Sequence, residues 1–282
     1  MTLQITPFDA PFGAEITGFN CTGCDGDSFA AVRQAWLDHC VVVFRDQTLT
    51  PDQHIAFSQR WGKLNGHILK QYLLPGYDTL LVVSNKRDES GAPLGIEDAG
   101  RYWHTDVSYE AVPPMGSLLY GLEVPEDGGD TLFASQYLAY DNLPGALKER
   151  IAPLRARHRF NYTQIQETEG STRKPLTDEQ KKQLTGAVHP VVRTHPDTGR
   201  KALYVNPGFT EALVDVPPDE GRALLDELFG YATDPAVIFR HRWRRGDLVL
   251  WDNRCLMHHA TPYPANSIRH MHRTTVAGTV PV

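Results

Sequence analysis

The sequence lacks the segments that would carry the chain into or across a membrane. No stretch approaches the roughly 18 consecutive apolar residues that a transmembrane helix needs. Residues 1–13 contain no basic segment followed by an apolar one, the pattern of a secretory signal. Surplus positive charge is also missing, because 28 Lys and Arg stand against 34 Asp and Glu, for a formal net charge of -6. We therefore expect a cytoplasmic protein without a membrane or nucleic-acid partner.

Cysteine is scarce as well, and 4 cysteines in 282 residues are too few for a disulfide scaffold. Cys21 and Cys24 form a C-x-x-C, a spacing found in redox sites and in half of a zinc site. No second C-x-x-C exists and no strand–helix unit follows it, so reduced thiols in a loop are the favoured interpretation. Cys40 and Cys255 adjoin apolar runs and are expected to be small core residues.

The remaining composition is that of an ordinary globular protein, with 41% hydrophobic and 22% charged residues. No internal repeat and no separating linker stands out, so residues 1–282 are expected to form one domain. Within it, residues 161–186 are polar and read as an insertion with a surface helix, for which a lid is a reasonable use. Residues 85–101 are polar and contain glycine, which predicts a mobile loop.

Short β-branched and apolar runs separated by turn residues dominate the chain. Strands are expected within 3–18, 41–44, 79–83, 116–122, 132–135, 188–193, 202–205, 237–243, 248–252 and 269–277. Helices are expected at 28–39, 50–62, 141–151, from 177 and from 217. Many short strands with peripheral helices indicate a mainly β fold, an antiparallel sandwich or jelly roll, rather than an α/β sheet.

The segment Trp103-His104-Thr105-Asp106 contains the first candidate site. In an extended chain, residues two apart point the same way, so His104 and Asp106 share a face. An imidazole and a carboxylate are two ligands of the facial triad that non-haem Fe(II) oxygenases use. By itself His-x-Asp is a weak signal, because it occurs often by chance and needs a third ligand from elsewhere.

Eleven other histidines compete for the third position, and most have simpler explanations. His258 and His259 follow the expected strand 248–252 in the β-rich C-terminal part of the chain. Neighbouring residues of a strand face opposite ways, so only one of the two can look inward. Alternation alone does not choose between them.

Arg269 and Arg273 are four apart on one expected strand and share a face with Met271. Two inward arginines are costly unless each meets an anion, because guanidinium stays charged and binds carboxylates in bidentate fashion. The alternative turns both arginines to solvent and puts 268, 270 and 272 inside, a face less apolar than a core demands. We therefore favour two anion-binding arginines.

Several motifs in one order now point to a known family. They are Gly13-Ala14-Glu15-Ile16, Phe44-Arg45-Asp46-Gln47, Trp103-His104-Thr105-Asp106, Gly128-Gly129-Asp130-Thr131, Trp251-Asp252-Asn253-Arg254, His258 and Arg269-His270-Met271-His272-Arg273. Together they resemble the taurine / 2,4-dichlorophenoxyacetate dioxygenases, which are Fe(II)- and 2-oxoglutarate-dependent oxygenases, nearly from end to end. This resemblance implies a double-stranded β-helix (a jelly roll with flanking helices) and the cofactors Fe(II), 2-oxoglutarate and O2.

The resemblance also implies the roles of individual residues. His104, Asp106 and His258 would ligate iron, and His259 would not. Arg269 would pair with the distal carboxylate of 2-oxoglutarate, with help from the Thr131 hydroxyl. Residues assigned to the organic substrate are Arg273 and His67 for its anionic group, and Phe209 with Asn206 in the segment Asn206-Pro207-Gly208-Phe209 for the pocket wall.

The substrate itself stays open. Gly100, Arg101, Thr163, Gln164 and the segment 65–70 differ from the taurine enzymes, which argues against taurine itself. A sulfonate, a sulfate ester, an aryloxy acid and other carboxylates all fit a pair of anion-binding residues such as Arg273 and His67. A zinc hydrolase on the same triad is an alternative that leaves Arg269 and Thr131 unexplained, and a non-catalytic anion-binding jelly roll is another. Relatives are often dimers or tetramers, which predicts a homo-oligomer.

Overall fold

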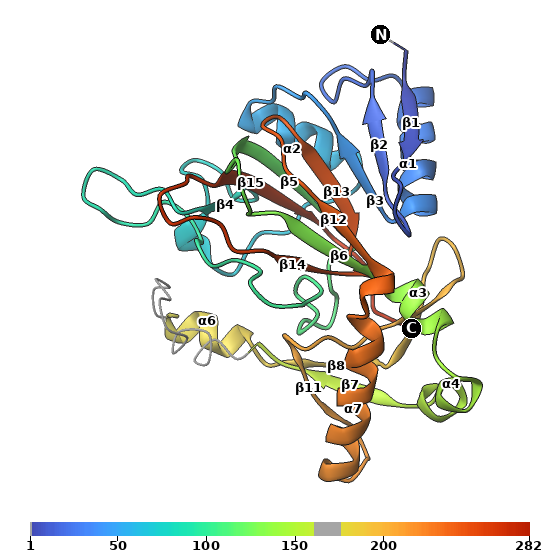
Figure 1. Ribbon diagram of the computed structural model, residues 1–282. Helices are drawn as coiled ribbons and strands as arrows, with labels where there is room; N and C mark the ends of the chain where they lie inside the picture. Colours follow the sequence, from blue (N-terminus) through green and yellow to red (C-terminus); the bar gives the residue numbers. More distant parts are fainter. Residues whose placement is uncertain (1, 161–175) are drawn as a thin grey trace.

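The computed structural model describes residues 2–160 and 176–282, and it has the predicted mainly β architecture (Figure 1). Two sheets pack face to face in the manner of a jelly roll. The major sheet has the strand order β1-β2-β3-β13-β5-β15-β4, and the minor sheet has the order β12-β6-β14. All pairs are antiparallel except β2 with β3.

The strands of these two sheets lie close to their predicted positions, except β14, which was not among the predicted strands. They are β1 (Gln4–Pro7), β2 (Ala14–Thr17), β3 (Val41–Phe44), β4 (Leu81–Ser84), β5 (Gly116–Glu123), β6 (Thr131–Ser135), β12 (Ile238–His241), β13 (Leu248–Asp252), β14 (Leu256–Ala260) and β15 (His270–Val276). Smaller sheets at one end contain β7 (Arg155–His158), β8 (Ala187–Pro190), β9 (Val192–Thr194), β10 (Lys201–Leu203) and β11 (Thr210–Leu213).

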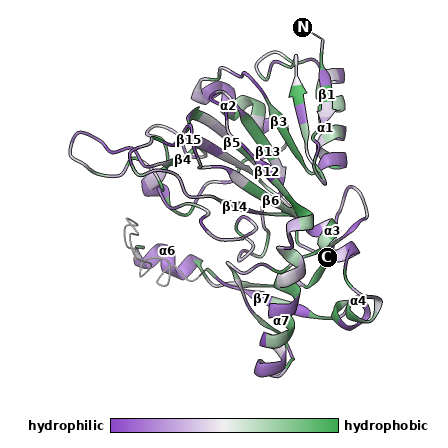
Figure 2. Ribbon diagram, in the orientation of Figure 1, coloured by the Kyte–Doolittle hydropathy of each residue, from purple (hydrophilic) through white to green (hydrophobic). Residues whose placement is uncertain are grey.

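Strand alternation divides the apolar residues into three layers. In β13, Val249 and Trp251 face the core between the sheets, whereas Leu248 and Leu250 face helices on the outer side of the major sheet. Strands buried on both faces read as continuous apolar runs, which is why 41–44 and 248–252 were recognisable. Figure 2 shows the hydrophobic colouring concentrated in these central strands, while α6 is hydrophilic.

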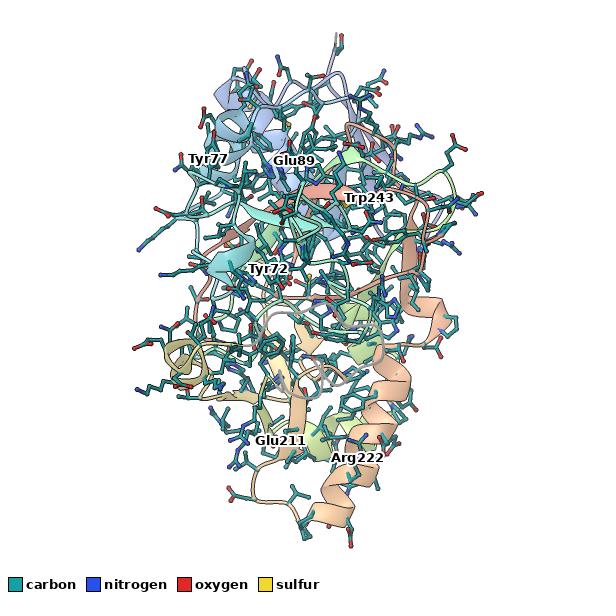
Figure 3. The ribbon with its side chains drawn as sticks, turned by 90° about the vertical axis from the view of Figure 1, so that its left-hand side faces the viewer. Tyr72, Tyr77, Glu89, Glu211, Arg222 and Trp243 are labelled. Atoms are coloured by element: carbon teal, nitrogen blue, oxygen red, sulfur yellow. The ribbon has the colours of Figure 1, made fainter. Side chains whose placement is uncertain are left out.

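The helices cover the two outer surfaces. The outer face of the major sheet packs on α1 (Gly26–His39) and α2 (Pro51–Gln59), and the minor sheet packs on α7 (Pro218–Ala232). The other helices in the described part of the chain are α3 (Gln136–Asp141), α4 (Gly145–Ile151), α6 (Asp178–Gln183) and two short 3-10 turns, η1 (Lys70–Tyr72) and η2 (Pro235–Val237). Figure 3 places Glu211 of β11 and Arg222 of α7 together at the lower end of the molecule.

The sequence predicted the N-terminal caps of two helices correctly, but it placed the start of a third helix too early. Thr50 forms the expected capping box with Gln53, and Thr177 forms one with Gln180. The helix predicted at 141–151 is present as α4, but it begins only after Pro144, and α3, which ends at Asp141, was not predicted. Proline disfavours a helical conformation in the residue before it, so the chain cannot run through this point as one helix.

Of the two segments predicted to be a lid and a mobile loop, the structure describes the first only in part and the second completely. Of the predicted lid, residues 161–175 lie outside the described residues, and 176–186 carry α6. The loop 85–101 is anchored by Ile96, whose backbone forms hydrogen bonds with Val82 and Ser84 of β4, and the mobility of this loop stays a prediction.

All four cysteines are free, with Cys40 and Cys255 buried as expected. No helix in the described part of the chain is long and apolar enough to span a membrane.

Candidate active site

A backbone bridge brings the two histidines of the candidate site together. The segment 100–104 lies along the free edge of β14, where His104 N–H and His258 N–H each donate to the other residue's carbonyl, at 3.1 and 2.9 Å. His258 faces the core between the sheets and contacts Trp251 and Phe133, whereas His259 turns to the opposite face and packs on Trp103. This is the inward choice that alternation had left open.

His104, Asp106 and His258 present their ligand atoms to one point. These atoms all lie within 4.8 Å of one another. Oδ1 of Asp106 is 3.7 Å from His104 Nε2 and 4.0 Å from His258 Nε2. The residues are only 6%, 2% and 6% exposed, so few water molecules can compete for these atoms.

Hydrogen bonds hold two of these side chains in the orientation that a metal needs. Nδ1 of His104 lies 2.9 Å from the Tyr102 carbonyl, so it carries the proton and Nε2 keeps a free lone pair. Oδ2 of Asp106 accepts from Ser117 Oγ at 2.7 Å. Ser117 in turn accepts from Asn253 Nδ2, and Asn253 accepts from the Trp251 indole. This relay leaves Oδ1 to face the two imidazoles.

The charges of the site also suit a divalent cation. Burial alone would raise the pKa of the Asp106 carboxyl, but Arg273, His258 and His104 outweigh it and hold this pKa well below its usual value. Burial, together with His104, keeps the pKa of His258 well below its usual value. One carboxylate and two imidazoles form a fitting donor set for a first-row metal such as Fe(II).

Arg269 lines a hollow on one side of this centre. Its side chain is 5% exposed, and among the described residues it forms no ion pair with a carboxylate. Burial lowers its pKa to about 10. The same hollow is lined by Thr131, whose Oγ1 accepts the Trp243 indole N–H at 3.0 Å and so keeps its own proton to donate. Arg269 and Thr131 thus offer donors to one buried anion.

Arg273 lines this hollow and also two further hollows of the molecule. Its Nη1 donates to Asp106 Oδ1 at 3.0 Å. Its Nε is buried without a hydrogen-bond partner among the described residues. Arg273 and Met271 face inward, while His272 and Thr274 face α2, where Thr274 bonds Ser58. The alternative with the arginines in solvent is therefore wrong, because α2 covers the other face of β15.

The largest of the three hollows has an aromatic wall. It encloses about 500 Å3, part of which is open to solvent. His67 and Phe209 line it, as predicted from the resemblance. Sequence reasoning had no signal for most of the other lining residues, which are Tyr109, Phe160, Ile68, Leu69, Leu81, Ile96, Ala99 and Val107. Phe209 packs edge-on against Tyr102, Tyr109 and Phe160.

Asn206 is not among the residues that line these hollows. Its Nδ2 donates to Ser108 and its Oδ1 accepts the Phe209 N–H at 2.8 Å. With both ends engaged, this amide holds the turn that presents Phe209. Thr163 and Gln164 lie outside the described residues.

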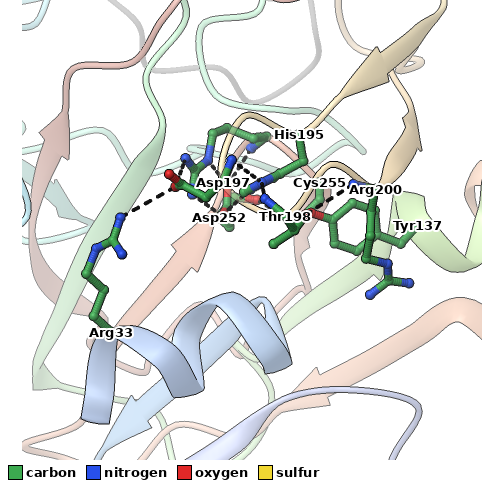
Figure 4. A network of polar contacts seen from close by, with 9 residues as sticks. Arg33, Tyr137, His195, Asp197, Thr198, Arg200, Asp252 and Cys255 are labelled. Atoms are coloured by element: carbon green, nitrogen blue, oxygen red, sulfur yellow. Dashed lines mark hydrogen bonds and ion pairs between the residues drawn. The ribbon is translucent and has the colours of Figure 1, made fainter. Parts of the chain in front are cut away.

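In a second group, His195, Asp252 and Cys255, the possible metal-ligand atoms also lie within 4.8 Å of one another. Figure 4 shows it embedded in a polar network instead. Arg254 binds both oxygens of Asp252, and His195 Nε2 lies 3.0 Å from the same carboxylate. His195 Nδ1 accepts two backbone N–H groups. Because Arg254 already balances Asp252, this network ties the turn 195–199 to β13 and suits no added cation.

Comparison with known proteins gives these features their context. The profile described as taurine catabolism dioxygenase TauD, TfdA family matches residues 4–275. The chain is 36% identical to the (S)-phenoxypropionate/alpha-ketoglutarate-dioxygenase of Sphingobium herbicidovorans, over 98% of this chain and 95% of that protein.

Solved structures agree with the sequence match. A taurine dioxygenase from Burkholderia xenovorans superimposes with a TM-score of 0.82 and 34% identity, covering 100% of this chain and 91% of that one. AAD-2, solved with Mn(II) and N-oxalylglycine, superimposes with a TM-score of 0.80 and 32% identity, covering 100% and 99%. The chain therefore belongs to the TauD, TfdA family, and it is an alpha-ketoglutarate-dependent dioxygenase that uses Fe(II), 2-oxoglutarate and O2.

Proposed function

We propose that this enzyme oxidises a small organic anion that carries a flat apolar group, such as an aryloxyalkanoic acid. In this proposal His104, Asp106 and His258 hold Fe(II), while Arg269 and Thr131 bind the distal carboxylate of 2-oxoglutarate. When bound, iron and 2-oxoglutarate supply the activation of O2, with oxidative decarboxylation of the co-substrate to succinate. The protein's part is to bind both anions and to fix which carbon of the substrate faces the metal.

The Nε of Arg273, which has no hydrogen-bond partner among residues 2–160 and 176–282, is the observation that carries this proposal. It is a buried guanidinium donor beside the candidate metal centre, and guanidinium binds a carboxylate or sulfonate through a pair of N–H groups. His67 lines the same hollow and can add a second polar contact. An anion held here would have its remaining atoms directed along the wall of Tyr102, Tyr109 and Phe209.

That wall favours an aromatic substrate over a short polar one. Tyr102, Tyr109, Phe160 and Phe209 surround the hollow, and aromatic pairs add about 0.5–1.5 kcal/mol beyond the area they bury. Taurine is short and polar, so it would present little apolar surface to these rings. The relative named for (S)-phenoxypropionate is consistent with this choice. If oxidation falls on the carbon that bears the ether oxygen, the product collapses and the ether is cleaved.

The test is succinate release from 2-oxoglutarate under Fe(II) and O2, with phenoxyacetate, taurine and an alkyl sulfate added in turn. We expect the largest stimulation with phenoxyacetate. A larger effect of taurine would contradict the substrate class, and no succinate from any anion would favour a hydrolase or a binding protein instead. His258→Ala should abolish turnover, while His259→Ala, which removes the neighbouring outward imidazole, should retain it.

A further inference from the structure

Arg273 touches the carboxylate that would hold the metal. Its Nη1 is 3.0 Å from Asp106 Oδ1, the oxygen that also faces His104 Nε2 and His258 Nε2. Both side chains are largely buried, at 12% and 3% exposure. The other carboxylate oxygen, Oδ2, is bound by the neutral Ser117 hydroxyl. A full positive charge therefore lies against the metal-facing oxygen alone.

The free edge of the same guanidinium faces the other way. Nε of Arg273 has no hydrogen-bond partner, and Asp106 is the only carboxylate paired with Arg273 in the part of the chain that the structure describes. Arg273 also lines all three hollows. An anion that binds through Nε would leave the Nη1 bond to Asp106 in place. Arg273 would then bridge the anion and the metal ligand.

Electrostatics gives this bridge a direction. In the absence of an anion, the guanidinium draws electron density from Oδ1 and places a positive charge beside the position of a divalent cation. Charges at this depth interact strongly, since the surroundings screen them far less than water does. An anion on the Nε edge neutralises that charge, so Asp106 becomes a better ligand.

We propose that Arg273 couples the affinity for the metal to the occupancy of the anion site. This proposal rests on the metal and substrate sites of the proposed function and adds their thermodynamic linkage. Linkage is reciprocal, so the bound metal would tighten anion binding by the same factor, typically about 5- to 150-fold. The enzyme would hold its metal loosely when empty and firmly when its substrate is present.

The experiment measures Mn2+ affinity of the metal-free protein by titration calorimetry, without 2-oxoglutarate, in the presence and absence of phenoxyacetate. Arg273→Gln should bind Mn2+ at least about 5-fold tighter than the unaltered protein when no anion is present. It should gain nothing further from phenoxyacetate. Arg273→Lys retains the charge and should stay weak. The matched control, Arg269→Gln, removes a buried charge that does not touch Asp106, and it should keep the response to phenoxyacetate.

Three outcomes would overturn the coupling. One is that Arg273→Gln binds Mn2+ no tighter than the unaltered protein, a comparison that needs no knowledge of the substrate. Another is that phenoxyacetate tightens Mn2+ binding equally in Arg273→Gln, which would indicate direct chelation. The third is loss of the phenoxyacetate effect in Arg269→Gln. Failure of the proposed function is a separate result: Mn2+ would bind undiminished to His104→Ala. Thermal unfolding of each variant checks that it is folded.

Discussion

Removing the Ser117 hydroxyl tests how Asp106 is held. Ser117 lies in β5, is fully buried, and donates to Asp106 Oδ2 at 2.7 Å. In Ser117→Ala the carboxylate loses this donor and can rotate, and Asn253 Nδ2 loses its acceptor. A hydrogen bond to a charged group contributes about 1.5–3 kcal/mol. Since 1.4 kcal/mol is about tenfold in an equilibrium constant, Mn2+ should bind roughly 10- to 100-fold more weakly.

The measurement is Mn2+ titration of the metal-free protein, with its thermal unfolding recorded alongside. Ser108→Ala is the matched control, because Ser108 is equally buried and only two residues from Asp106, but bonds His158 and Asn206 instead. We expect both variants to lose stability and only Ser117→Ala to lose metal affinity. Equal metal affinity in the two variants would refute an orienting role for Ser117.

Two further predictions concern buried ionisable side chains. Arg269→Ala should raise the KM for 2-oxoglutarate at least about a hundredfold, because breaking a buried ion pair costs roughly 3–5 kcal/mol; an unchanged KM in a succinate assay would exclude that role. Burial, with His272, lowers the pKa of His54 from 6.5 to about 3. Below pH 6.5, His54 is protonated in the unfolded chain but stays neutral in the folded protein. The free energy of unfolding should therefore fall by about 1.4 kcal/mol per pH unit as the pH drops from 6.5 towards 3. His54→Asn should flatten this dependence in denaturant titrations, and an unaltered slope would contradict it.

The fold was largely predictable because its signals are local. The capping box at Thr50 and the apolar run 41–44 each lie within a few neighbouring residues, and tertiary packing did not override them. The helix predicted at 141–151 was given too early a start, because Pro144 separates α3 from α4 and the helix begins only after it. The faces of β15 became unambiguous only with α2 in place, since alternation leaves open which face a helix will cover.

The site was less predictable from residues alone, because its parts come from distant positions in the chain. Nothing local to Trp103-His104-Thr105-Asp106 says that it will lie along β14, and the resemblance to a family supplied His258. Ser117 gave no signal, because one serine in the apolar run of β5 looks like any small core residue. Asn206 was assigned to the pocket wall with Phe209, yet both ends of its amide form hydrogen bonds that hold the turn before Phe209.

Asp106 joins the separate parts of the site. One oxygen is fixed by a relay of neutral donors from β5 and β13, which sets the plane of the carboxylate. The other faces two imidazoles and one guanidinium, so its strength as a ligand depends on what Arg273 binds. A change at Ser117 should therefore weaken metal binding whether or not an anion is present, whereas a change at Arg273 should remove the difference between those two conditions. Measuring both variants in both conditions separates orientation of the ligand from control of its charge.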